Sequence, residues 1–133
     1  MNRHYFLTSA LIVLLLISGL PESAFPQGRP YAKYGSSGET IGIFKLAEDP
    51  SSCGTWRVIT GTIMVVRSQK RNQEVDYRLT VRSVSRLWSF AFSLSVDELP
   101  RPDIVNLVTA NRRVKLRACE ATGPLLVEEI TRS

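Results

Sequence analysis

Several segments of the chain alternate between apolar and polar residues with a period of two, which is typical of half-buried antiparallel strands. Residues 75–84 and 87–95 show the pattern most clearly, and residues 113–118 repeat it. We expect their apolar positions to line one core: Tyr77, Leu79, Val81, Trp88, Phe90, Phe92, Leu94, Val114, Leu116 and Ala118.

Three further segments are rich in apolar residues without such clear alternation. Residues 56–67 are long and rich in β-branched side chains, and Gly61 interrupts them, which predicts a strand with a bulge or a sharp bend. A polar loop is expected at residues 68–73. Residues 40–46 predict a short strand before a turn, and residues 125–130 predict the last strand.

The pattern changes between the predicted strands at residues 87–95 and 113–118. Ile104, Leu107 and Val108 fall at helical spacing. Pro102 suits the first turn of a helix, and Asn111 suits the position just past its end. We therefore expect one short helix of about two turns here.

The first residues of the chain have the order of a secretory signal peptide. Arg3 precedes an apolar run that ends at Leu20, and small or helix-breaking residues follow up to Ala24. The run is shorter than a bilayer-spanning helix requires. We expect cleavage after Ala24 and export to the periplasm or the extracellular space, with an uncleaved anchor as the alternative.

The expected organisation is therefore a signal peptide at residues 1–24, a flexible leader at 25–39 and one domain at 40–133. The leader is predicted from its Pro, Gly, Ser and Gln content. Cys53 and Cys119 are the two cysteines of the chain. In an oxidising compartment such a pair is expected to form a disulfide, not a metal site.

The order of three strands, a short helix and two strands, with a long first strand bent at glycine, resembles the oligonucleotide/oligosaccharide-binding (OB) fold. The resemblance covers residues 53–132 and implies an all-β, five-stranded OB-like barrel with the helix between strands three and four. In that fold the first and fourth strands pair antiparallel, which would bring Cys53 and Cys119 together. An immunoglobulin-like sandwich that recruits residues 40–46 is the alternative.

Enzymatic chemistry finds little support in the residues. The only histidine is His4, which would leave with the signal peptide. The carboxylates occur as local pairs near turns and strand edges, and no glycine-rich phosphate loop is present. We therefore expect a non-enzymatic protein without a metal or a cofactor.

The net charge of +5 favours anionic partners. The OB resemblance implies a ligand lying across strands two and three, beside the loop between strands one and two. Small residues on the third strand leave room there, whereas the aromatic residues are expected in the core. The predicted ligand-binding cations are Arg67, Lys70, Arg71, Arg78 and Arg82.

A second basic stripe is expected on the fourth strand, at Arg113, Lys115 and Arg117. It serves either as a charged face that blocks strand aggregation or as a contact with an anionic surface. The favoured function is an exported module that binds an anionic ligand, such as an acidic glycan or a lipid headgroup. The alternatives are an interaction subunit of an envelope or secretion assembly, which binds a partner protein, and an extracellular single-stranded nucleic-acid binder.

Overall fold

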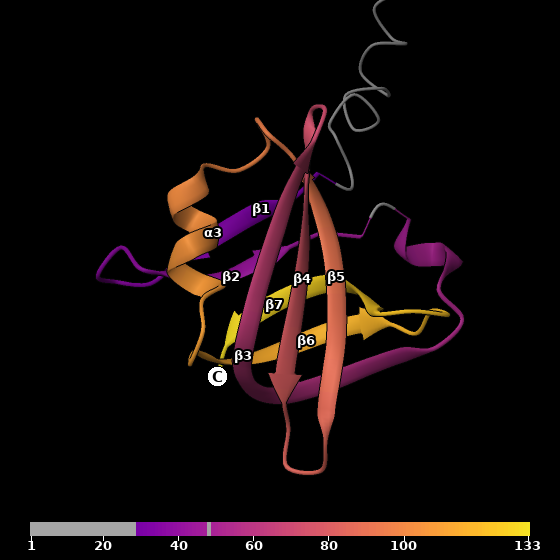
Figure 1. The fold of residues 1–133 in the computed structure, drawn as a ribbon. Helices are drawn as coiled ribbons and strands as arrows, with labels where there is room; N and C mark the ends of the chain where they lie inside the picture. Colours follow the sequence, from indigo (N-terminus) through magenta and orange to yellow (C-terminus); the bar gives the residue numbers. More distant parts are fainter. Residues whose placement is uncertain (1–28, 48) are drawn as a thin grey trace, which may run out of the picture.

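The computed structural model describes residues 29–47 and 49–133, and the predicted signal peptide lies outside this range. The described residues form one sheet of seven strands with one short α-helix (Figure 1). The elements are β1 (Tyr31–Tyr34), β2 (Thr40–Phe44), the 3-10 turn η1 (Pro50–Ser52), β3 (Trp56–Arg71), β4 (Glu74–Arg82), β5 (Leu87–Ser95), α3 (Arg101–Leu107), β6 (Arg113–Cys119) and β7 (Leu125–Arg132).

The strands follow the order β1-β2-β7-β5-β4-β3-β6, and β7 also pairs with β6. The contact between β5 and β7 is parallel and short, with Phe90 opposite Leu125 and Ala91 opposite Leu126. All other pairings are antiparallel. β7 therefore contacts β2, β5 and β6, while β3 contacts both β4 and β6.

The prediction of five strands is wrong, because β1 and β2 join the same sheet. β1 lies inside residues 25–39, where a flexible leader was expected. It pairs with β2, and Tyr31 stacks on Phe44 with 5.3 Å between ring centroids. β2 in turn pairs with β7, with Ile43 opposite Ile130. The single sheet also differs from the two packed sheets of an immunoglobulin-like sandwich.

β3 changes its pairing partner near the glycine that predicted a bend. It pairs with β6 from Trp56 to Thr62 and with β4 from Thr62 to Arg71, and Figure 1 shows its sharp turn. A Cβ atom on Gly61 would lie 2.3 Å from the carbonyl oxygen of Arg82, so this close approach requires glycine. A register shift follows between Ile63 and Val65.

The polar loop predicted at residues 68–73 is mostly strand. β3 continues to Arg71, and only Asn72 and Gln73 form the turn to β4. Asn72 has a φ of 58°, which is the left-handed conformation that asparagine tolerates. The end of β3 extends past the core, and its residues are exposed. Its polar composition therefore resembled that of a loop.

The core lies where the alternation placed it. Leu79, Val81, Phe90 and Leu116 are buried, and α3 adds Ile104 and Leu107. Each fully buried apolar side chain stabilises the fold by roughly 1.5–3 kcal/mol. Trp88 departs from the predicted core, because its side chain is only half-buried. Its Nε1 donates to Ser83 Oγ at 3.0 Å, and the guanidinium of Arg86 lies 3.6 Å from its ring centroid.

The predicted disulfide between Cys53 and Cys119 is present, with 5.8 Å between the Cα atoms. Cys53 lies just before β3, and Cys119 is the last residue of β6. The antiparallel register of these two strands places Cys119 opposite Trp56. The bond therefore joins the two strands at the end of their pairing.

Candidate ligand-binding surface

Three of the five predicted cations share the outer face of β3 and β4. Arg67 and Arg78 are direct partners in the antiparallel pair, so their side chains lie on the same face. Leu79 and Val81 are buried, and the alternation therefore directs Arg78 and Arg82 outward. All three arginines are exposed. We call Arg67, Arg78 and Arg82 the basic face.

Lys70 does not belong to this face. Its partner on β4 is Val75, whose side chain packs against the core. Because direct partners share a face, Lys70 lies on the side of the sheet opposite Arg67 and Arg78. The prediction that five cations converge is therefore wrong for Lys70.

Arg71 lies on the outer face but already has anionic partners. Its Nη2 is 3.0 Å from Asp76 Oδ2 and 4.0 Å from Glu74 Oε1. Asp76 also accepts a hydrogen bond of 2.6 Å from Ser93 Oγ. The Ser93 hydroxyl and then the Arg71 guanidinium hold the pKa of Asp76 below its ordinary value. The charge of Arg71 is thus compensated within the fold.

The basic face has no such close ion pair, although the charge of Arg78 contributes, after Ser93 and Arg71, to the lowering of the pKa of Asp76. Within the described part of the chain, no carboxylate oxygen lies within 4.0 Å of a guanidinium nitrogen of Arg67, Arg78 or Arg82. Like charges directly opposite each other on neighbouring strands destabilise a sheet. The Arg67–Arg78 pair therefore costs stability, and a bound anion would relieve that repulsion. Next to Arg78 on β5 lies Ala91, whose small side chain leaves space above the sheet.

The second basic stripe, on β6, also contains one cation that is paired with a carboxylate and two that are not. Arg117 forms an ion pair with Glu128, and its guanidinium lies 3.9 Å from the ring centroid of Trp56. Arg113 and Lys115 are exposed, and neither forms an ion pair with a described carboxylate. Buried Val114 and Leu116 alternate with them, so both cations point outward.

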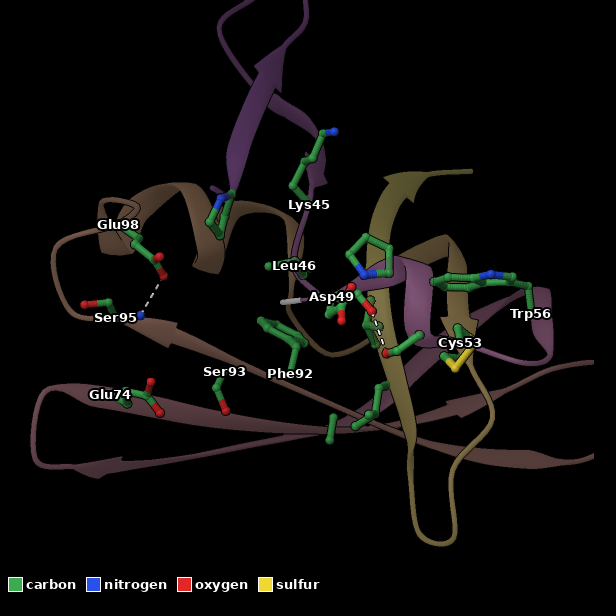
Figure 2. A pocket seen from close by; sticks show the side chains of 18 residues that line it. Lys45, Leu46, Asp49, Cys53, Trp56, Glu74, Phe92, Ser93, Ser95 and Glu98 are labelled. Atoms are coloured by element: carbon green, nitrogen blue, oxygen red, sulfur yellow. Dashed lines mark hydrogen bonds between the residues drawn. A yellow bond between two sulfur atoms is a disulfide. The ribbon is translucent and has the colours of Figure 1, made fainter. Parts of the chain in front are cut away.

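A groove of about 540 Å³ lies beside the basic face, between β5 and residues 45–47 and 49–53 (Figure 2). Ala91, Ser93 and Ser95 contribute from β5, and Leu126 contributes from β7. The sequence did not predict this groove, because it arises where a segment distant in sequence crosses β5.

The charged groups of the groove are mainly acidic. Asp49, Glu74 and Glu98 line it, and among the described residues that line it Lys45 is the single cation. The backbone N–H of Ser95 donates to Glu98 Oε1 at 2.8 Å, which holds that carboxylate at one end of the groove (Figure 2). Carboxylates repel an anionic ligand, so the groove and the basic face favour opposite charges.

Within residues 29–47 and 49–133, no group of three or more His, Cys, Asp or Glu side chains could hold a metal ion. The same residues contain no helix with the length and apolar character needed to cross a membrane. Comparisons with protein-family models, curated proteins and solved structures find no match to this chain.

Proposed function

We propose that this chain is an exported, non-enzymatic binding module, and that its ligand is anionic. The observation that carries the proposal is the Arg67–Arg78 pair, in which two exposed arginines occupy directly opposite positions on one face of the sheet. Among the described residues, no carboxylate lies within 4.0 Å of either guanidinium group. Export is supported by the Cys53–Cys119 disulfide, because such bonds persist mainly in oxidising compartments.

We further propose that β3 to β7 form an OB-like barrel, to which β1 and β2 are added. The support comes from the pairings, which run from β3 to β4, β5, β7 and β6 and return from β6 to β3. The helix α3 lies between the third and fourth of these strands, as the resemblance implies. The basic face then lies on the first two strands of the barrel, and Ala91 and Ser93 lie on the third.

An acidic glycan fits this surface better than a nucleic acid does. Proteins that bind single strands stack the bases on exposed aromatic rings. Tyr77, Phe90 and Phe92 on the neighbouring strands are buried. The half-buried rings of Trp56 and Trp88 each lie against a guanidinium group, that of Arg117 and that of Arg86. A sulfated or carboxylated sugar requires cations and hydrogen-bond donors, which the arginines supply.

The proposal is tested by binding of the mature protein to immobilised heparin at increasing salt. We expect retention that falls steeply with salt, because the contacts are electrostatic. Arg67→Ser with Arg78→Ser should abolish most of the retention. The matched control, Lys70→Ser with Arg101→Ser, removes the same charge from other surfaces and should retain it.

Two outcomes would favour the other functions. Stronger retention on single-stranded DNA than on heparin would indicate a nucleic-acid binder. Elution from both matrices at physiological salt, together with a co-purifying protein in light scattering, would indicate a subunit of an assembly. Equal losses in the arginine variant and in the control would show that only the net charge matters.

A further inference from the structure

The basic face and the second stripe meet at one residue of β3. Thr62 is the direct partner of Arg82 on β4 and also the direct partner of Arg113 on β6. Direct partners in antiparallel pairs share a face, so Arg82 and Arg113 flank Thr62 on the same surface. The neighbours of all three residues agree, because Val81, Ile63 and Val114 are fully buried and point the other way.

We infer that Arg67, Arg78, Arg82, Arg113 and Lys115 form one continuous track for a linear acidic polysaccharide. This inference rests on the proposed anion-binding function and names its ligand class. Lys115 continues the track beyond Arg113, because it lies on the same face of β6 opposite Thr60.

The dimensions of the track suit a chain better than a single anionic group. Arg78 and Arg82 are four positions apart on β4, which corresponds to roughly 13 Å. Crossing two strand spacings from Arg82 to Arg113 adds roughly 10 Å, and the step to Lys115 adds roughly 7 Å. A monosaccharide or a lipid headgroup would contact only part of this length.

The neighbouring surfaces limit the path of such a chain. Toward the β3–β4 turn, Arg71 is already paired with Asp76 and Glu74. Toward β5, the groove presents the carboxylates of Asp49, Glu74 and Glu98. The remaining route leads past Thr62 to β6.

The far end of the track is a shallow hollow of about 240 Å³. It is lined by Val58, Lys115, Arg117, Glu129 and Thr131. No ion pair within 4.0 Å joins Glu129 to Lys115, so the ammonium group of Lys115 is available to contact a ligand. The exposed side chain of Val58 provides an apolar contact for a sugar ring at this end.

The test compares a heparin disaccharide with a long, size-defined heparin chain in titrations of the mature protein at several salt concentrations. The variant that removes the second stripe is Arg113→Ser with Lys115→Ser. We expect it to weaken the long chain about tenfold and to reduce the slope of log K against log salt by about two. The disaccharide, which occupies the basic face, should bind as it does to the unaltered protein.

Two further variants separate charge from folding. Arg113→Lys with Lys115→Arg keeps both charges and should keep the affinity for the long chain. Lys70→Ser with Arg101→Ser removes two charges outside the track and should change the affinity much less than the stripe variant does. Thermal unfolding of each variant checks that the domain is intact.

The track is wrong if the stripe variant and the control weaken the long chain equally, or if chain length does not affect affinity. The proposed function is tested separately by the affinity of the Arg67→Ser, Arg78→Ser variant for the disaccharide. A loss of that affinity would support anion binding at the basic face even if the track does not exist. Binding of oligo-dT as strong as that of long heparin, with the same salt slope, would overturn the assignment to a polysaccharide.

Discussion

The hydroxyl of Tyr34 donates a hydrogen bond of 2.7 Å to the carboxylate of Asp103, and this bond ties β1 to α3. From the sequence, Tyr34 was predicted to lie in a flexible leader and Asp103 in a short helix, with no contact between them. Together with the stacking of Tyr31 on Phe44, the bond explains why residues 31–34 are part of the ordered domain.

Replacing Tyr34 with Phe should lower stability slightly near neutral pH, because the variant lacks the donor to Asp103. The hydrogen bond to Asp103 is the main cause that raises the pKa of Tyr34 above its ordinary value of 10.0. A raised pKa means that the contribution of Tyr34 is present below pH 10 and is lost as the pH rises through the pKa of the folded state. Urea unfolding of both proteins between neutral and strongly alkaline pH measures this. A stability difference that does not shrink above pH 10 would contradict the assignment.

Gly61 and Gly54 provide a matched pair for testing the bend of β3. A Cβ on Gly61 would meet the Arg82 carbonyl oxygen at 2.3 Å, whereas a Cβ on Gly54 would meet nothing within 4 Å. Gly61→Ala should therefore destabilise the domain by about 1–3 kcal/mol, because backbone must move to accommodate the methyl group. Gly54→Ala should change the free energy of unfolding very little. Similar values for the two variants in urea unfolding would show that the close approach at Gly61 does not exist.

The alternating strands were predictable because their pattern depends on a single buried face. β4, β5 and β6 each place every second residue in the core, and the predicted core positions of these strands are buried, apart from half-buried Trp88. α3 was predictable from its apolar spacing and from the prolines at its start. β1 was not, because its Pro- and Gly-rich surroundings resemble a linker and its order depends on contacts with β2 and α3.

The candidate site was predictable only in part, because register is a tertiary property. The shift between Ile63 and Val65 reverses which residues of β3 point outward, and this reversal moves Lys70 to the opposite face. The ion pairs of Arg71 depend on the same register. The junction at Thr62 required knowing that β3 pairs with both β4 and β6 around one residue.

The Cys53–Cys119 bond should account for a large part of the stability of so small a domain. It closes a loop with a sequence separation of 66. On the chain-entropy model, a loop of that length corresponds to about 4 kcal/mol. Cys53→Ser with Cys119→Ser should lose about this amount in urea unfolding, and the unaltered protein under reducing conditions should lose a similar amount. A reduced protein as stable as the oxidised one would show that the bond is absent in solution.

Asp76 controls how many cations the outer face of β3 and β4 presents. Hydrogen bonds from Ser93 and then Arg71 lower its pKa below the ordinary value of 3.8. A lowered pKa means that its contribution to stability is present above pH 3.8 and is lost as the pH falls through the pKa of the folded state. Asp76→Asn should therefore destabilise the domain at neutral pH, with a difference from the unaltered protein that shrinks in acid.

The same substitution should strengthen binding to heparin at neutral pH, because it removes the nearer of the two carboxylates that pair with Arg71 on the face that carries Arg67. Ser93→Ala is the companion variant, since it leaves the Arg71–Asp76 pair in place. It should raise the pKa of Asp76 in an NMR titration without strengthening the binding. If Asp76→Asn weakens heparin binding although the domain remains folded, Asp76 does not restrain Arg71, and the charge of Arg71 is unavailable to a ligand for another reason.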